Sequence, residues 1–371
     1  MTEEDYMESK KELNDAELAE WRAGEARRTA FWDKRVNTLI DNVEEVLTLD
    51  QMQAVRDYWS QWKENVNPAW AAWYTRGNGL FDPCYIPNNI YFGRISRALN
   101  RRDYLNNPLL QDKNYLDLIF PDLIRPVTIV RNVYGQFLDR NYRAISVKEA
   151  TLLCLREEEF VLKPSLDTKG AKNVEFISTE GKTKEEMTLL LQAHGKDYIV
   201  QRVIKQHPWL GALNPDSVNT IRVLSLLWND ETMILGSAVR IGTKGVRVDN
   251  LVRSHGVSCA IGDDGCLIRT AYDKMGFPVE RLPNGIRFEH YPIPGYDRAI
   301  ALVKESHARL AHFRLIGWDI SITEDGEPVL IEANLDVPEL AFHQFAMGPV
   351  FGNGELLREV LEFTYEQYPM Y

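Results

Sequence analysis

Residues 317–334, GWDISITEDGEPVLIEAN, carry the most informative pattern in the chain. Asp325-Gly326 is a dipeptide preferred in two-residue type I′ hairpin turns, and strand-like runs flank it on both sides. Such a turn places Asp319 directly opposite Glu332, on a face that Asn334 shares because side chains alternate along a strand. We therefore expect a β-hairpin in which two carboxylates face each other across the strands.

Two directly opposed carboxylates repel each other and destabilise a strand pair, so this arrangement needs a physical explanation. Either the face is solvated, or the two groups share one proton, or a divalent cation lies between them. The amide oxygen of Asn334 favours the cation, because Mg²⁺ prefers oxygen ligands and keeps its other positions for water and phosphate. We predict that Asp319, Glu332 and Asn334 are metal ligands for Mg²⁺, with Mn²⁺ as the alternative ion.

Cations occupy positions where the sequence pattern calls for apolar residues. Lys163 lies inside the short apolar strand 160–164, FVLKP, and Arg222 shares a strand face with two leucines. A buried charge is costly unless it is paired, so we expect these cations to face an anion. Arg240 lies on the partner strand and faces the same side as Arg222 only if the hairpin contains a bulge or an odd-numbered loop.

The chain has 371 residues, of which 44% are hydrophobic and 26% charged, and its formal net charge is −11. This composition is typical of a globular protein, and the length suggests about 2.5 domains. The net charge argues against a nucleic acid polymer or an acidic membrane as the main partner. The four cysteines lack C-x-x-C spacing, which predicts free thiols. Without an apolar run long enough for a bilayer or a signal peptide, the expected location is cytoplasmic, with no membrane insertion.

Hydrophobic spacing divides the chain into three predicted regions. The early part has helical periodicity and holds six of the nine tryptophans, which predicts packed helices with an aromatic core. Strands and helices then alternate, and two helices open on capping boxes at Ser146 and Thr183. We predict a helical region at 1–110, a small subdomain at 111–205 and a larger subdomain at 206–371.

The order of these residues resembles the ATP-grasp superfamily. The resemblance rests on Asp319 followed by Glu332-x-Asn334, with Lys163 upstream and two arginines between. It extends over residues 110–350 and is strongest to the sugar-transfer-associated ATP-grasp family, through the stretches LNPDSVNTIRVLSLLWNDETMILGSAVRIG, VDNLVRSHGVSCAIG and IGWDISIT. The same order is also similar to ligases that add glutamate to peptides. The resemblance implies an α+β fold, in which two α+β subdomains sandwich ATP, beside a mainly helical N-terminal region.

The resemblance also implies roles for individual residues. Arg222 and Arg240 would be catalytic, because they would stabilise the transferring phosphoryl group or an acyl phosphate. Asn250 would line the side of the acceptor substrate. His255 stands where the family commonly has a Gly-Gly pair; it would be either a new substrate-binding side chain or a partner in a local structural hydrogen bond. The residues implied in nucleotide binding are Lys113, Lys163, Lys169 and Gly170 at the phosphates, and Gln201, Arg202 and Val203 at adenine, largely through backbone.

These roles predict an ATP- and Mg²⁺-dependent ligase that joins a carboxylate to an amine through an acyl-phosphate intermediate. No side-chain nucleophile is required, and the sequence offers no Ser/His/Asp or Cys/His pattern. Two alternatives stay open, a kinase of a small hydroxyl acceptor and a nucleotide-binding protein without turnover. The expected partners are small-molecule or peptide carboxylates and amines, with a homodimer as a further association to consider.

Overall fold

The computed structural model describes residues 15–100, 108–166, 172–249 and 255–367. The chain divides into two compact units, which we call the helical unit (residues 1–98 and 351–371) and the sheet unit (residues 99–350). The C-terminal helix therefore groups with the N-terminal helices, whereas the sequence placed it in the larger subdomain. The predicted boundaries at residues 110 and 205 stay predictions.

The helical unit is built around aromatic side chains, as expected. Trp59 and Trp70 are almost wholly buried, and Trp32 stacks on Phe92 with ring centroids 4.8 Å apart. The elements of this part of the chain are α2 (Asp15–Asn37), η1 (Val43–Glu45), α3 (Leu49–Ser60), α4 (Ala69–Asn78), α5 (Asn88–Ile90), η2 (Tyr91–Ile95), α6 (Ser96–Leu99) and α16 (Glu355–Gln367). No helix in the described part of the chain combines the length and apolar character needed to cross a membrane.

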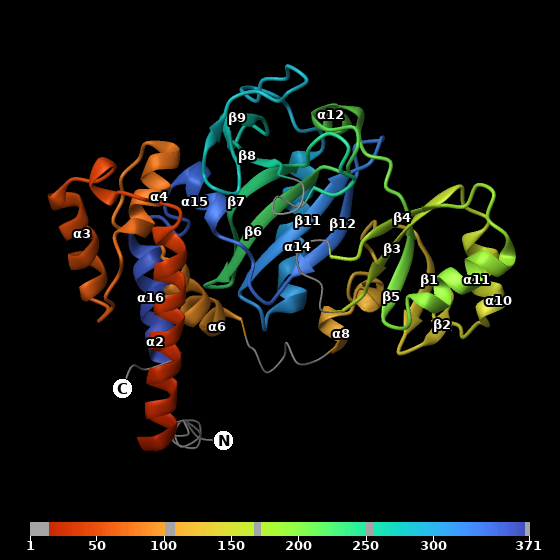
Figure 1. Ribbon diagram of the computed structural model, residues 1–371, viewed down its shortest axis with the longest axis horizontal. Coiled ribbons are helices and arrows are strands. Elements are labelled where there is room, and N and C mark those ends of the chain that lie inside the picture. Colours follow the sequence, from red (N-terminus) through yellow and green to blue (C-terminus); the bar gives the residue numbers. More distant parts are fainter. Residues whose placement is uncertain (1–14, 101–107, 167–171, 250–254, 368–371) are drawn as a thin grey trace. The chain divides into compact units, whose positions relative to one another are not determined.

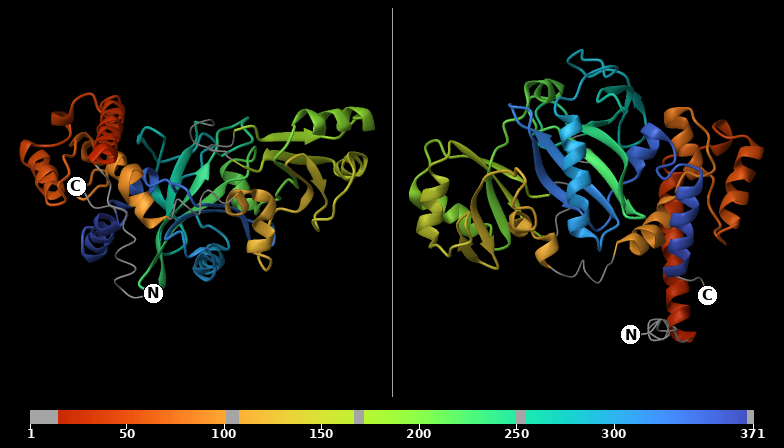
Figure 2. Two further views of the ribbon diagram at one scale, coloured as in Figure 1. Left: turned by 90° about the horizontal axis from the view of Figure 1, so that it is seen from below. Right: turned by 180° about the vertical axis from the view of Figure 1, so that it is seen from behind.

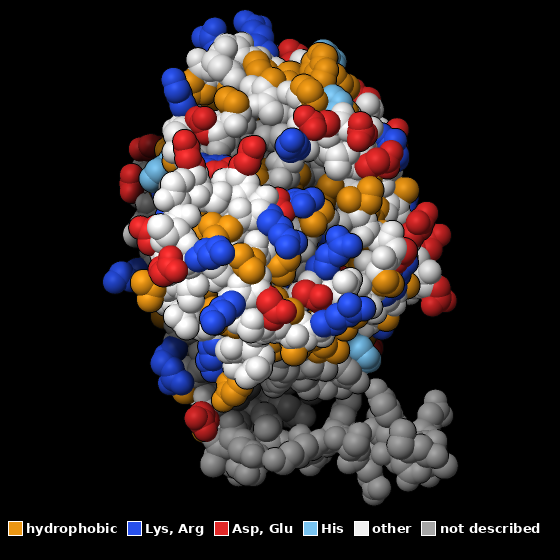
Figure 3. All heavy atoms as spheres, turned by 90° about the vertical axis from the view of Figure 1, so that its right-hand side faces the viewer, with side chains coloured by type: hydrophobic (Ala, Val, Ile, Leu, Met, Phe, Trp, Pro, Cys, Tyr) orange, Lys and Arg blue, Asp and Glu red, His pale blue; other side chains and the backbone are white. Residues whose placement is uncertain are grey.

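The first sheet of the sheet unit has five antiparallel strands in the order β2-β1-β5-β3-β4 (Figure 1). Its strands are β1 (Thr128–Val133), β2 (Gln136–Leu138), β3 (Glu159–Pro164), β4 (Glu175–Ser178) and β5 (Tyr198–Arg202). Helices α10 (Val147–Cys154) and α11 (Lys184–Ala193) share an apolar core with it, and both begin at the predicted capping boxes. On the face at this end of the unit, basic and acidic side chains are intermixed (Figure 3).

The second sheet has seven antiparallel strands in the order β10-β9-β8-β7-β6-β11-β12. Its strands are β6 (Thr220–Trp228), β7 (Glu231–Ile241), β8 (Val257–Ile261), β9 (Leu267–Tyr272), β10 (Pro278–Val279), β11 (Leu315–Ile322) and β12 (Pro328–Asn334). Helix α14 (Tyr296–Ser306) lies along one face (Figure 2), where Tyr296 contacts Ser237. Helix α15 (Ala341–Met347) packs at the neighbouring Gly236, and therefore on the opposite face.

Shorter helices connect these sheets and cover their ends. They are α8 (Pro108–Gln111), η3 (Lys113–Tyr115), α9 (Leu116–Ile119), α12 (Pro208–Leu213) and η4 (His307–Leu310). All four cysteines are free thiols, as the spacing predicted. The α+β architecture with two antiparallel sheets and a helical N-terminal region confirms the expected fold class.

The β11–β12 hairpin confirms the pairing of Asp319 with Glu332 but reaches it through a different turn. The Gly326 N–H donates to the Thr323 carbonyl oxygen at 2.9 Å, and Gly326 is left-handed with φ +84°. Asp325 does not have the positive φ that a type I′ turn requires, so that predicted turn is wrong. The turn is centred one residue earlier, and Gly326 follows it as the left-handed residue.

This turn changes the register of the hairpin by one residue. Next to it, Ser321 pairs with Val329, an offset that would carry Asp319 away from Glu332. A bulge beyond Asp319 restores the register, so that Asp319 lies opposite Glu332. The predicted pairing therefore holds because a turn and a bulge compensate each other.

The β6–β7 hairpin also contains a bulge, and this one decides where its arginines point. Thr220 pairs with Arg240 and Arg222 pairs with Ala238, while the register shifts between Leu224 and the next residue. Because Thr220 and Arg222 are two residues apart, Arg240 shares the face of Arg222. The bulge that the sequence required for this arrangement is therefore present.

The contact of α14 with the β11–β12 turn yields a stability prediction. Gly295 has φ +71°, and a Cβ there would lie 2.5 Å from the Gly326 carbonyl oxygen. Gly195 has φ +72° with nothing within 4 Å of such a Cβ. In urea unfolding we expect Gly195→Ala to lose about 1 kcal/mol from backbone strain alone. Gly295→Ala should lose about 3 kcal/mol, because the collision adds to the strain. Equal losses would contradict the contact.

Candidate functional site

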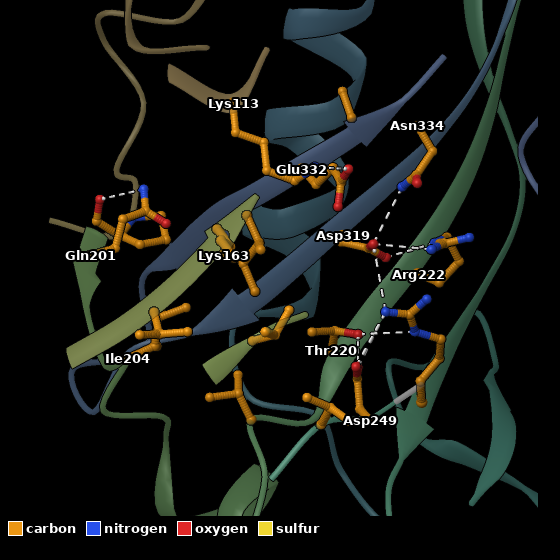
Figure 4. Close-up of a pocket in the computed structure, with 18 of the residues that line it drawn as sticks. Lys113, Lys163, Gln201, Ile204, Thr220, Arg222, Asp249, Asp319, Glu332 and Asn334 are labelled. Atoms are coloured by element: carbon orange, nitrogen blue, oxygen red, sulfur yellow. Dashed lines mark hydrogen bonds and ion pairs between the residues drawn. The ribbon is translucent and has the colours of Figure 1, made fainter. Parts of the chain in front are cut away.

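A cavity of about 670 Å³ lies in the sheet unit, within the size range of small-molecule sites. Residues of β3, β4 and β5 from the first sheet and of β6, β7, β11 and β12 from the second line it (Figure 4). The predicted site residues found in this lining are Lys113, Lys163, Gln201, Arg202, Val203, Arg222, Arg240, Asp319, Glu332 and Asn334. Strands that are distant in the sequence therefore bring most of the predicted site together.

Asp319 forms a bidentate ion pair with Arg222 of the adjacent strand. The Arg222 Nε donates to Asp319 Oδ1 at 2.6 Å, and Arg222 Nη2 donates to Asp319 Oδ2 at 3.0 Å. Arg240 Nη2 lies 3.5 Å from the same Oδ2. Burial raises the pKa of Asp319, but Arg222 and Arg240 outweigh burial and hold the pKa at about 2. Asp319 is therefore a carboxylate at neutral pH.

Glu332 has a different cationic partner, Lys113, whose Nζ lies 3.0 Å from Glu332 Oε1. Lys113 opens the short helix η3, where Asp112 caps the first turn by accepting the Asn114 N–H at 2.9 Å. The Lys113 N–H donates to the Ser165 carbonyl oxygen, just beyond β3. The two opposed carboxylates are thus balanced by cations from separate elements.

Lys163 comes from β3 and lines the same cavity. Its ammonium has no hydrogen bond or ion pair with any residue that the structure describes, although Lys113 and Glu332 are close enough to influence its charge. Burial, followed by repulsion from Lys113, lowers the pKa of Lys163 to about 8. Because the Lys163 ammonium has no close partner among the described residues, it can bind an anionic ligand without first breaking an ion pair.

The residues predicted to contact adenine lie at the end of β5, with Val203 directly after it. Gln201 is buried, and its Nε2 lies 3.4 Å from both the Pro126 carbonyl oxygen and Thr128 Oγ1. The Arg202 guanidinium is held outside by Glu157, with N–O distances of 2.9 and 2.8 Å. The Arg202 backbone N–H donates to the Val127 carbonyl oxygen at 2.9 Å, and an adenine contact through the Arg202 backbone stays a prediction.

The cavity lining also contains polar residues that the sequence did not indicate, among them Thr220 and Asp249. The Thr220 hydroxyl donates to Asp249 and accepts from Arg240 Nε at 3.2 Å. Thr220 is two residues before Arg222, so strand periodicity was a usable signal for it. Asp249 lies in a loop, where no periodic pattern reveals the direction of a side chain.

Of the four other predicted residues, the structure describes only His255, which lies outside the cavity lining. His255 is exposed, with φ +51° and its Nδ1 3.4 Å from Lys274 Nζ. Lys169, Gly170 and Asn250 lie outside the described residues. The roles of all four stay predictions.

The chemistry of the predicted metal ligands fits a hard cation. Asp319 and Glu332 are directly opposed and offer carboxylate oxygens. The Asn334 amide nitrogen donates to the Gly317 carbonyl oxygen at 2.9 Å, so its amide oxygen stays an acceptor. Among the described residues no group of three or more His, Cys, Asp and Glu is suited to a metal. An ion here would therefore need Asn334 and further oxygens from a ligand or water, as Mg²⁺ commonly takes.

The lowered pKa of Lys163 yields a pH prediction. Below about pH 8 the ammonium is charged before a ligand binds, whereas above it a polyphosphate must bring a proton with it. We expect the metal-free affinity for ADP, measured by calorimetry, to fall by up to about tenfold per pH unit above pH 8. Lys163→Arg should flatten this dependence, because arginine stays charged. An unchanged slope in Lys163→Arg would show that Lys163 does not contact the phosphates.

Comparison with solved structures finds distant likenesses to ligases. The ATP-grasp ligase PsnB, solved with a minimal precursor, is 11% identical, with a TM-score of 0.40 over 72% of this chain and 63% of that chain. D-alanyl-alanine synthetase A from Vibrio cholerae is 12% identical, with a TM-score of 0.39 over 69% and 65%. The L-amino acid ligase from Bacillus licheniformis is 13% identical, with a TM-score of 0.37 over 69% and 47%.

The chain spans less than two thirds of each of these solved chains, and likeness at this level does not extend their activities to it. No curated protein matches the chain. A family model is more informative: sugar-transfer associated ATP-grasp matches residues 94–360, which is more than half of the chain and includes every residue of the site. The chain therefore belongs to the sugar-transfer associated ATP-grasp family, within the ATP-grasp superfamily.

Proposed function

We propose that this protein is an ATP- and Mg²⁺-dependent ligase that joins a carboxylate to an amine. The observation that carries the proposal is the meeting of cations from both sheets with two opposed carboxylates in one cavity of nucleotide-compatible size. Phosphoryl transfer needs such a site, because charge on the transferring group must be neutralised and the reactants held in line.

The lysines are suited to hold the polyphosphate. Lys163 has no close partner among the described residues, so it can bind a phosphate oxygen without first breaking an ion pair. Lys113 is bound to Glu332 at 3.0 Å and would exchange this carboxylate for a phosphate when nucleotide enters. Asp319, Glu332 and Asn334 would hold Mg²⁺, which supplies positive charge to the phosphate oxygens as a Lewis acid.

The arginines are suited to the transfer itself. A carboxylate oxygen of the first substrate attacks the γ-phosphorus, the bond to the β-phosphate oxygen breaks, and ADP and an acyl phosphate result. The amine nitrogen then attacks the acyl carbon, forms the amide bond, expels inorganic phosphate and loses a proton. Arg222 and Arg240 lie on one face of the β6–β7 hairpin, where they can stabilise the negative charge of both steps.

Substrate requirements and ¹⁸O labelling of the carboxylate test the proposed ligase reaction. We expect phosphate release from ATP to require both a carboxylate and an amine when amino acids, peptides and amino sugars are screened. With ¹⁸O in the carboxylate, one ¹⁸O should appear in the released phosphate, detected by mass spectrometry. A phosphorylated hydroxyl product would instead establish a kinase. Nucleotide binding without any turnover across the panel would favour a binding protein.

Glu332→Gln tests the predicted ligand set. The substitution keeps the side-chain shape but removes the charge that would bind the metal, so we expect ATP turnover to fall at least a hundredfold, about 2.7 kcal/mol in activation free energy. Glu324→Gln is the matched control, because Glu324 is exposed at the turn of the same hairpin. Normal turnover by Glu332→Gln would refute its assignment as a metal ligand.

A further inference from the structure

Arg240 lies between two carboxylates, Asp249 and Asp319. How closely it pairs with each of them affects the charge at the predicted metal site. On one side, Arg240 Nη2 lies 3.3 and 3.4 Å from the two oxygens of Asp249. On the other side, the same nitrogen lies 3.5 Å from Asp319 Oδ2. Asp319 already accepts two bonds from Arg222, at 2.6 and 3.0 Å, and a weaker one from Asn334 Nδ2 at 3.3 Å (Figure 4). A full ion pair with Arg240 would therefore leave Asp319 little capacity for a metal.

Asp249 and Thr220 together hold Arg240 by hydrogen bonds, while Arg240 Nη2 stays 3.5 Å from Asp319 Oδ2. The Thr220 hydroxyl accepts from Arg240 Nε at 3.2 Å and donates to Asp249. Both oxygens of Asp249 lie within hydrogen-bonding range of these donors, and the residue is 9% exposed. A charge-assisted network of this kind is directional, so it fixes the plane of the guanidinium as well as its position.

The loop that carries Asp249 is anchored where it leaves β7. A Cβ on Gly242 would lie 2.9 Å from the Val248 carbonyl oxygen and 3.0 Å from Ser217 Oγ, so only glycine permits this close packing. The Gly245 N–H donates to Asp216 Oδ2 at 2.6 Å. The loop is thus attached to the segment before β6, and Asp249 is placed by the fold.

We propose that Asp249 is a positioning residue that, with Thr220, holds Arg240 by hydrogen bonds, keeps it from pairing with Asp319 more closely than 3.5 Å, and so leaves an Asp319 oxygen available to a divalent cation. The proposal rests on the proposed function, because it assigns a partner to that metal site. The pKa of Arg240 is consistent with this geometry. Burial lowers the pKa of Arg240, but attraction first to Asp249 and then to Asp319 more than offsets burial and leaves the pKa above its ordinary value.

The test measures Mn²⁺ binding, so it requires no knowledge of the substrates. Mn²⁺ affinity is measured by electron paramagnetic resonance with a saturating non-hydrolysable ATP analogue. For Asp249→Asn we expect about a tenfold loss of Mn²⁺ affinity, in line with couplings within one hydrogen-bond network. Metal-free affinity for the analogue should change less than twofold, because the lysines and the end of β5 remain intact.

A double-mutant cycle distinguishes an effect of Asp249 through Arg240 from direct metal binding or an effect of its charge alone. If Asp249 acts through Arg240, Asp249→Asn should have no effect on Mn²⁺ affinity in an Arg240→Gln background. A persistent loss there would mean that Asp249 binds the metal or acts only by its charge, and would overturn the proposal. Thr220→Val gives an independent arm that keeps the strand shape, and we expect a smaller loss of Mn²⁺ affinity, again absent with Arg240→Gln.

The same experiment distinguishes failure of the proposed function from failure of the role proposed for Asp249. If the wild-type complex with the ATP analogue binds no Mn²⁺, the proposed function and the role of Asp249 are both refuted. If the wild type binds Mn²⁺ and neither Asp249→Asn nor Thr220→Val weakens it, only the role of Asp249 is overturned.

Discussion

The site depends on the bidentate ion pair between Arg222 and Asp319, at 2.6 and 3.0 Å, in adjacent strands of the larger sheet. Asp319 is 5% exposed, and removing one partner from a buried pair typically costs about 3–5 kcal/mol. The pair keeps Asp319 ionised, which in turn constrains its neighbours. Glu332, directly opposite, needs a cation of its own, and Lys113 supplies it from a separate segment.

Register is the second constraint, because side chains in a sheet reach the cavity only from one face. Both hairpins of the site contain bulges, one beyond Asp319 and one beyond Leu224. Without the second bulge, Arg240 would point to the face that α14 covers rather than toward Arg222. Irregular pairing is therefore what brings the charges of four strands onto one surface.

These features explain which parts of the molecule could be predicted from the sequence. The capping boxes at Ser146 and Thr183 are local signals, and the structure has both helices where they indicated. Asp319 opposite Glu332 was also predicted, but from a turn that the structure does not contain, because bulges leave no reliable mark in a single sequence. Asp249 was missed because tertiary packing at Gly242 places its loop. Local and periodic features were predictable, whereas loop placement was not.

The charge arrangement also shows how the protein's own cations balance the two opposed carboxylates. Opposed carboxylates in a largely buried cavity are stable only if cations balance them, and here Lys113, Arg222 and Arg240 do so. Under the proposed function, nucleotide gives Lys113 a phosphate partner at the moment when a metal takes over Glu332. Because each exchange replaces one ion pair by another, neither the Lys113 ammonium nor the Glu332 carboxylate is left buried without a partner. Metal and nucleotide should therefore bind cooperatively, since each relieves the electrostatic cost that the other would meet.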